Sequence, residues 1–256
     1  MFKEIRNLFS FLTILSKMDE DWLVDSAKLM FVFPLVGAFL GFLAGLLGWL
    51  LSLLLPSLIV GGLVLGVLLL LTGLHHTDGL LDFGDGIMAH GTPERKVEVM
   101  HDQLTGAGGL SLGILTFLVT ALCIGSLDSS FATWNIPIIL SGLVVAEVSA
   151  KLSMVVGAWA GKAAPSGMSV SFLAAMHGRK GDAALVAAIA ISLGIAVPLL
   201  WVAGAFLILV SVLVGLIMAE ISHRHFNYMT GDVLGATNEL SRMVAFIALL
   251  AVIGWA

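Results

Sequence analysis

Long apolar runs separated by shorter polar segments make up most of this chain. A helix needs about 20 apolar residues to cross the hydrocarbon layer of a membrane, and several of these runs reach that length. None of them alternates apolar and polar residues with the period of two that a membrane barrel requires. The pattern therefore predicts an all-α, polytopic membrane bundle of about seven spanning helices. They cover approximately residues 29–55, 58–74, 110–127, 136–159, 183–201, 202–219 and 243–256.

A different pattern precedes the first run. Lys3, Glu4 and Arg6 alternate at helical spacing with the apolar residues Phe2, Ile5, Leu8, Phe9, Leu12 and Ile14. A helix with one charged face and one apolar face lies in the interface between membrane and water. We therefore expect an amphipathic interfacial helix at the amino end.

Composition agrees with a membrane protein and excludes other classes. Of the 256 residues, 59% are hydrophobic and only 11% are charged, and the formal net charge is −5. A soluble domain has about 25% charged residues. Nucleic-acid binding requires a basic field, which this charge balance does not supply. We expect a single membrane-embedded domain over residues 1–256 that contacts membrane lipid and binds no nucleic acid.

Basic residues predict the orientation of the chain. Lys and Arg occur before the first run and after the second, fourth and sixth, and they are absent from the connections after the first, third and fifth. Only Lys151, inside the fourth run, departs from this alternation. By the positive-inside rule, the amino end is cytoplasmic and the carboxyl end lies outside a cell (cytoplasmic) membrane. The polar segments after the even-numbered runs then share the cytoplasmic face.

Residues 73–102 concentrate acids and histidines in a chain that otherwise avoids charge. Asp82 and Asp85 follow Asp78 at i+4 and i+7, so a helix places the three carboxylates within an arc of roughly 60°. Like charges on one face repel each other unless a cation binds between them. Carboxylate oxygens suit Mg²⁺, which keeps several waters and bridges to substrate phosphates.

Other polar positions are also candidates. Glu147 and Lys151 lie one helical turn apart inside the fourth run, and this spacing predicts that they pair. Ionisable residues at membrane depth are usually functional. Asp232 and Glu239 share a helical face in the polar block at residues 220–242. The long polar connection at residues 161–182 could be a lid or a substrate loop.

These residues support three chemistries. They are Mg²⁺-dependent transfer of a phosphate-containing group, prenyl transfer and cation- or proton-coupled transport. A relay for transport would place acids in the middle of the spans, whereas here they gather at one face. That distribution favours an enzyme over a transporter. The Asp cluster alone does not distinguish transfer of a phosphate-containing group from prenyl transfer.

The chain also resembles the adenosylcobinamide-GDP ribazoletransferase family, which is also called the cobalamin (5′-phosphate) synthase family. The matching stretches follow the family's order along nearly the whole chain. They are Phe11-Leu12-Thr13, Phe33-Pro34-Leu35-Val36-Gly37, Thr72-Gly73-Leu74-His75-His76-Thr77-Asp78-Gly79-Leu80-Leu81-Asp82-Phe83-Gly84-Asp85-Gly86, Glu94-Arg95-Lys96-Val97-Glu98-Val99-Met100-His101-Asp102, and Thr230-Gly231-Asp232-Val233-Leu234-Gly235-Ala236 with Glu239. Many members carry Ser-Arg directly after the position of Asp102, where this chain has Gln103-Leu104.

The resemblance implies an integral membrane enzyme of vitamin B12 biosynthesis. It would join α-ribazole, or its 5′-phosphate, to adenosylcobinamide-GDP and release GMP, with Mg²⁺ as cofactor. Asp78, Asp82 and Asp85 would hold the metal, Asp82 would also be catalytic, and His76 or Asp102 would take the hydroxyl proton. The residues that it implies for substrate binding are Arg95, Lys96, Lys151, Asp232, Asn238 and Glu239.

Two alternatives to this function remain. One is another Mg²⁺-dependent membrane transferase with a diphosphate donor, of the prenyltransferase or alcohol phosphatidyltransferase type, and the other is a transporter. The oligomeric state is also open. Gly37, Gly41 and Gly45 recur every four residues, and this flat face could close the bundle or join two copies as a homo-oligomer.

Overall fold

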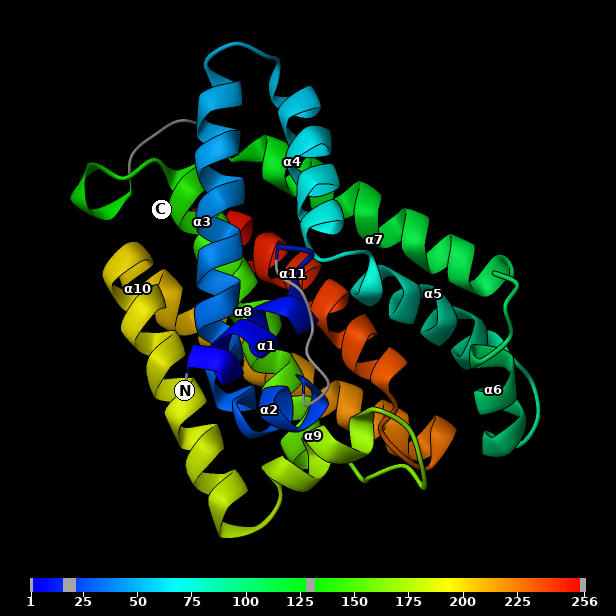
Figure 1. The fold of residues 1–256 in the computed structure, drawn as a ribbon. Helices are drawn as coiled ribbons and strands as arrows, with labels where there is room; N and C mark the ends of the chain where they lie inside the picture. Colours follow the sequence, from blue (N-terminus) through cyan, green and yellow to red (C-terminus); the bar gives the residue numbers. More distant parts are fainter. Residues whose placement is uncertain (1, 16–21, 128–131, 254–256) are drawn as a thin grey trace.

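The computed structural model describes residues 2–15, 22–127 and 132–253, which fold as helices (Figure 1). Apart from one isolated bridge between Ala163 and Met229, these described ranges contain no β-strand. The α-helices are α1 (Phe2–Leu12), α2 (Trp22–Lys28), α3 (Phe33–Ser52), α4 (Ser57–Leu71), α5 (His75–Met88), α6 (Pro93–Met100), α7 (Ala107–Ser126), α8 (Ile138–Ala160), α9 (Ser169–Met176), α10 (Gly178–Phe226) and α11 (Gly231–Ile253). Two short 3₁₀ turns, η1 (Met30–Val32) and η2 (Thr133–Asn135), precede α3 and α8.

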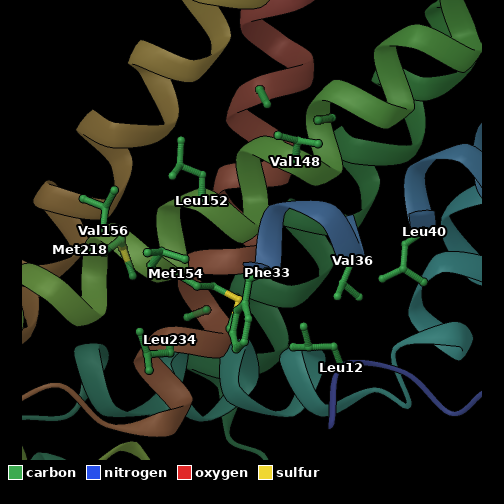
Figure 2. Packing of buried hydrophobic residues seen from close by; sticks show 14 of the residues in the cluster. Leu12, Phe33, Val36, Leu40, Val148, Leu152, Met154, Val156, Met218 and Leu234 are labelled. Carbon is green, nitrogen blue, oxygen red and sulfur yellow. The ribbon is translucent and has the colours of Figure 1, made fainter. Parts of the chain in front are cut away.

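Helix α8 forms the centre of the bundle. Its side chains are buried along almost its whole length, because α3, α10 and α11 pack around it. Figure 2 shows Leu152 and Met154 of α8 among Phe33 of α3, Met218 of α10 and Leu234 of α11. Glu147 and Lys151 of this helix are therefore also buried inside the bundle.

Glycines allow α3 to approach α8 closely. A Cβ atom at Gly37 would lie 2.5 Å from the carbonyl oxygen of Glu147, and one at Gly41 would lie 2.5 Å from that of Leu143. Only glycine fits such a backbone contact. The glycine face predicted from the sequence therefore closes the bundle within the chain.

The prediction of a polytopic helical membrane protein is confirmed, with fewer candidate spans than the seven apolar runs. Within the described residues, five helices are long and apolar enough to cross a membrane, or six if α4 and α5, bent by 97°, count as one span. The fifth and sixth runs belong to α10, which counts once although its backbone breaks at Trp201 (φ 54°, ψ −130°). A Cβ atom at Gly204 would lie 2.1 Å from the carbonyl oxygen of Ala196, so the two halves of α10 lie against each other beyond the break.

Helix α1 packs into the protein through part of its apolar face. Leu8 and Leu12 are buried, whereas Ile5 is 41% exposed. The Asn7 side chain donates a hydrogen bond to Asp25 of α2 at 2.9 Å. The position of this helix on the membrane surface stays a prediction.

Candidate active site

A sharp turn separates the acidic helix α5 from α4. Gly73 and Leu74 both adopt left-handed backbone conformations, with φ of 63° and 62°. Such a conformation is strained for leucine and persists only where the surrounding structure requires it. Because α5 bends 97° away from α4 and carries three carboxylates, we place it outside the membrane-spanning segments.

Two glycines hold α5 against α11. A Cβ atom at Gly79 would lie 2.8 Å from the carbonyl oxygen of Asp232, and one at Gly235 would lie 3.3 Å from the Cα atom of His76. This close crossing brings Asp232 to the acids of α5, although more than 140 residues separate them in sequence.

The carboxylates of α5 and α11 lie close enough to affect one another. Asp82 is half-buried, and burial raises its pKa to about 7 with further contributions from the negative charges of Asp78, Asp232 and Asp85. The repulsion expected from the i, i+4, i+7 spacing is therefore present, and Asp232 adds to it. A bound cation would relieve the repulsion.

Asp85 has a structural partner. Its two carboxylate oxygens accept hydrogen bonds from the backbone N–H groups of Gly106, at 2.7 Å, and Gly109, at 2.8 Å. Gly106 is the amino-terminal cap residue of α7, so Asp85 satisfies backbone donors at the start of that helix. Its metal-binding role stays a prediction, whereas its contact with α7 is explicit in the structure.

A pocket of about 330 Å³ opens beside the start of α5. One group of lining residues is polar and comprises His75, His76 and Asp78 of α5, Ser169 of α9 and Asp232 of α11. The second group is aromatic and comprises Phe11, Trp22, Phe33 and Phe172. Four different elements, α1, α2, α3 and α9, supply these rings.

His76 is a buried polar residue of the pocket. It is 6% exposed, and its Nδ1 atom has no hydrogen-bond partner among the residues that the structure describes. Burial, followed by the positive charges of Lys151 and Arg242, lowers the pKa of its imidazole well below the usual range. The lowered pKa favours the neutral ring, whose Nδ1 atom can form a hydrogen bond to a group bound in the pocket.

Lys151, Asn238 and Glu239 belong to a buried network and do not line the pocket. Lys151 Nζ donates to Asn238 Oδ1 at 2.6 Å, and Asn238 Nδ2 donates to Glu239 Oε1 at 3.0 Å. Arg242 bonds both Glu239 and Glu147, and all five side chains are at most 1% exposed. The sequence suggested that Glu147 and Lys151 pair, but the hydrogen-bonded partner of Glu147 is Arg242. The polar atoms of Lys151, Asn238 and Glu239 thus bond to one another and to Arg242, and not to the pocket. Substrate binding by these three residues stays a prediction.

The other predicted residues lie outside the pocket. Arg95 forms an exposed ion pair with Glu98 at 2.9 Å. Lys96 Nζ lies 3.1 Å from His225 Nδ1, near the end of α10. Asp102 is exposed and accepts a hydrogen bond from the backbone N–H of Leu104 at 3.3 Å. The structure thus groups His76, Asp78 and Asp232 at the pocket, with Asp82 one helical turn beyond Asp78.

No motif or spacing in the sequence assigns a role to the aromatic residues of the pocket. Phe11 and Phe33 belong to stretches that carry the family resemblance, and Phe172 lies in the connection considered as a lid or substrate loop. Membership in these stretches was the only feature of the sequence that could have pointed to a role for these rings. No spacing rule could show that they converge, because they belong to different helices.

An acidic helix that borders an aromatic pocket within a helical membrane bundle is suited to a membrane transferase that acts on phosphate-containing substrates. The chain belongs to the cobalamin-5-phosphate synthase family, whose sequence model matches residues 4–250. This assignment confirms the resemblance and favours the first of the three chemistries.

Curated relatives match over most of their length. A protein of Methanocella arvoryzae is 35% identical, with 97% of this chain and 96% of the relative covered. A relative from Methanosarcina barkeri is 33% identical, with 87% of this chain and 82% of the relative covered. A relative from Halorubrum lacusprofundi is 30% identical, with 98% of this chain and 97% of the relative covered. All three relatives are named adenosylcobinamide-GDP ribazoletransferase. No solved structure matches the chain.

Proposed function

We propose that this protein is an adenosylcobinamide-GDP ribazoletransferase that joins ribazole, or its 5′-phosphate, to adenosylcobinamide-GDP and releases GMP. The observation that carries the proposal is the pocket at the α5–α11 crossing, where aromatic rings adjoin His76, Asp78 and Asp232. The family assignment supplies the substrates.

The reaction exchanges one oxygen–phosphorus bond for another. A hydroxyl oxygen of ribazole forms a bond to the phosphorus atom that is attached to cobinamide. The bond between that phosphorus and the bridging oxygen of the diphosphate breaks, and the bridging oxygen leaves as part of GMP. The hydroxyl proton must move to a base as the new bond forms.

His76 is the base that the geometry supports best. It lines the pocket, and its buried Nδ1 atom has no other partner among the described residues. Asp102, the alternative from the sequence, is exposed and does not line this pocket. Replacing His76 by alanine should lower kcat for GMP release more than it raises either KM, and an Asp102→Asn variant should retain activity.

The acids near the pocket have the donor chemistry for Mg²⁺. No group of three or more His, Cys, Asp or Glu side chains among the described residues is arranged to hold a metal ion alone. Mg²⁺ usually takes only one or two carboxylates, together with waters and substrate phosphates. Asp78 and Asp82 would hold it, with Asp85 as the third predicted ligand, and the bound ion would offset the charge of the diphosphate.

Replacing Asp82 tests this assignment. Asp82→Asn keeps the shape of the side chain but removes the charge, and we expect kcat for GMP release to fall by about 100-fold. Asp182→Asn is the matched control, because Asp182 accepts a hydrogen bond from Trp159 outside the pocket. Undiminished GMP release by the Asp82 variant would remove the proposed role.

The distribution of basic residues supports a cytoplasmic amino end and a cytoplasmic active site, where water-soluble phosphorylated substrates are available. Single cysteines introduced at exposed Glu94 and at exposed Leu54 test this orientation in intact cells. A membrane-impermeant thiol reagent should label position 54 and not position 94. The reverse result would contradict the proposed orientation.

A further inference from the structure

The aromatic residues of the pocket form an ordered stack. The ring of Phe11 lies between Trp22, at a centroid distance of 5.4 Å, and Phe172, at 5.0 Å, and both interplanar angles are 24°. Phe33 meets Phe172 edge-on at 6.0 Å and 67°. Because these rings come from α1, α2, α3 and α9, the stack requires four elements to be in place.

The surroundings of the stack are apolar on one side and polar on the other. Met30, Met154, Met168 and Leu234 complete the apolar lining of the pocket. His76, Asp78 and Asp232 line the same pocket from the α5–α11 crossing. A ligand that fills this space needs a planar, weakly polar part and a hydroxyl-bearing part.

We propose that the four rings are the binding site for the base of the acceptor nucleoside, with its ribose directed toward His76. This inference rests on the proposed function. Ribazole is a riboside of a benzimidazole, a bicyclic aromatic base with few hydrogen-bonding groups. Its flat ring can pack on aromatic side chains, and its ribose then brings a hydroxyl group to the base and the carboxylates.

The alternative occupants fit less well. Guanine carries several donors and acceptors along its edge, and on the apolar side of the pocket, where the rings lie, methionine and leucine side chains would leave these groups unpaired. The cobinamide part of the donor is a macrocycle far larger than a pocket of about 330 Å³. The size of the pocket therefore matches the acceptor nucleoside better than the macrocycle of the donor.

Substitutions of the rings separate the two substrates kinetically. Phe172→Leu removes a ring on which the base can stack, and Phe11→Leu removes the ring that holds Trp22 and Phe172 in place. Each should raise KM for ribazole by about tenfold, since stacking of a base on an aromatic ring contributes about 1–3 kcal/mol. KM for adenosylcobinamide-GDP should change by less than about twofold, because the donor does not touch the stack. Phe9→Leu is the matched control, because Phe9 also belongs to α1 but contacts Phe39, at 5.5 Å, away from the pocket. The control should change neither KM.

Two results would overturn the inference while leaving the proposed function intact. In one, wild-type protein releases GMP but the Phe172 and Phe11 variants have an unchanged KM for ribazole. In the other, the variants raise KM for adenosylcobinamide-GDP instead, which would place the donor's guanine on the rings. Absence of GMP release from folded wild-type protein is a failure of the proposed function itself.

A photoreactive benzimidazole riboside tests the site without any substitution. Cross-linked to the wild-type protein and mapped by mass spectrometry, it should label peptides that contain Phe11, Trp22, Phe33 or Phe172, and excess ribazole should prevent the labelling. Labelling confined to other peptides would contradict the inference. This readout needs no turnover, so it stays informative if GMP release is not observed.

Discussion

Asp85 shows how the local environment can decide what a carboxylate does. Its spacing from Asp78 and Asp82 makes it equivalent to them on the helix, but its oxygens accept the N–H groups of Gly106 and Gly109. An anion at a helix amino terminus is stabilising because it satisfies unpaired donors and complements the helix dipole. We therefore expect Asp85 to stabilise the start of α7, whereas Asp78 is proposed to bind the metal ion.

Asp85→Ala should lower the free energy of unfolding by about 1–2 kcal/mol, the usual effect of removing an amino-terminal cap. Asp78→Ala should leave that free energy unchanged and abolish most GMP release. Thermal unfolding of the two purified variants in the same detergent measures the first effect, and the activity assay measures the second. Equal stability of the two variants would show that the contact of Asp85 with α7 is not stabilising.

At the scale of the elements, the site depends on the close crossing of α5 and α11. Gly79 faces the backbone of Asp232, and Gly235 faces that of His76, so this crossing sets the distance between the polar groups of the pocket. Neither glycine has a positive φ, so the requirement at these positions is space.

Gly79→Ala should destabilise the protein by about 1–3 kcal/mol, because its Cβ would lie 2.8 Å from a backbone oxygen and the helices would have to separate. The same separation moves Asp232 from Asp78 and should lower kcat. Gly62→Ala in α4 is the control, because nothing lies within 4 Å of the added atom. A Gly79 variant as stable and active as the Gly62 variant would contradict this account of the crossing.

At the scale of the whole molecule, the buried network joins α8, the central helix, to α11. It contains two carboxylates and two cations, Glu147, Glu239, Lys151 and Arg242, and these groups are nearly inaccessible to solvent. Such a cluster is tolerated in an apolar interior because each charge has a hydrogen-bonded partner. The positive charges of Lys151 and Arg242 in this network contribute to the lowered pKa of the His76 imidazole.

Arg242→Met should destabilise the bundle by about 3–5 kcal/mol, because it leaves Glu147 and Glu239 buried without their main partner. Arg224→Met is the control, since Arg224 pairs with Glu220 on the surface and its loss should have little effect. Denaturant unfolding followed by tryptophan fluorescence compares the two variants. Similar midpoints would mean that the network does not hold α8 to α11.

The sequence predicted those features that depend on neighbouring residues. Local patterns are enough to predict the helical membrane class and the contact face of Gly37 and Gly41. They are also enough to predict the helical spacing of Asp78, Asp82 and Asp85. Features that depend on distant pairing were missed or assigned differently. Arg242 and Glu147 are 95 residues apart, and the rings of Phe11 and Phe172 meet only after α1 and α9 have packed. Apolar residues on a membrane helix look alike in sequence whether they face lipid, the core or a pocket.

The most direct test of the central claim is GMP release by the purified protein supplied with adenosylcobinamide-GDP, ribazole or its 5′-phosphate, and Mg²⁺. We expect GMP to form in step with the ribazole-containing product, and to disappear when ribazole is omitted or when the metal is chelated. Folded protein that releases no GMP with all components present, or that releases it without ribazole, would contradict the assignment of this pocket to ribazole transfer.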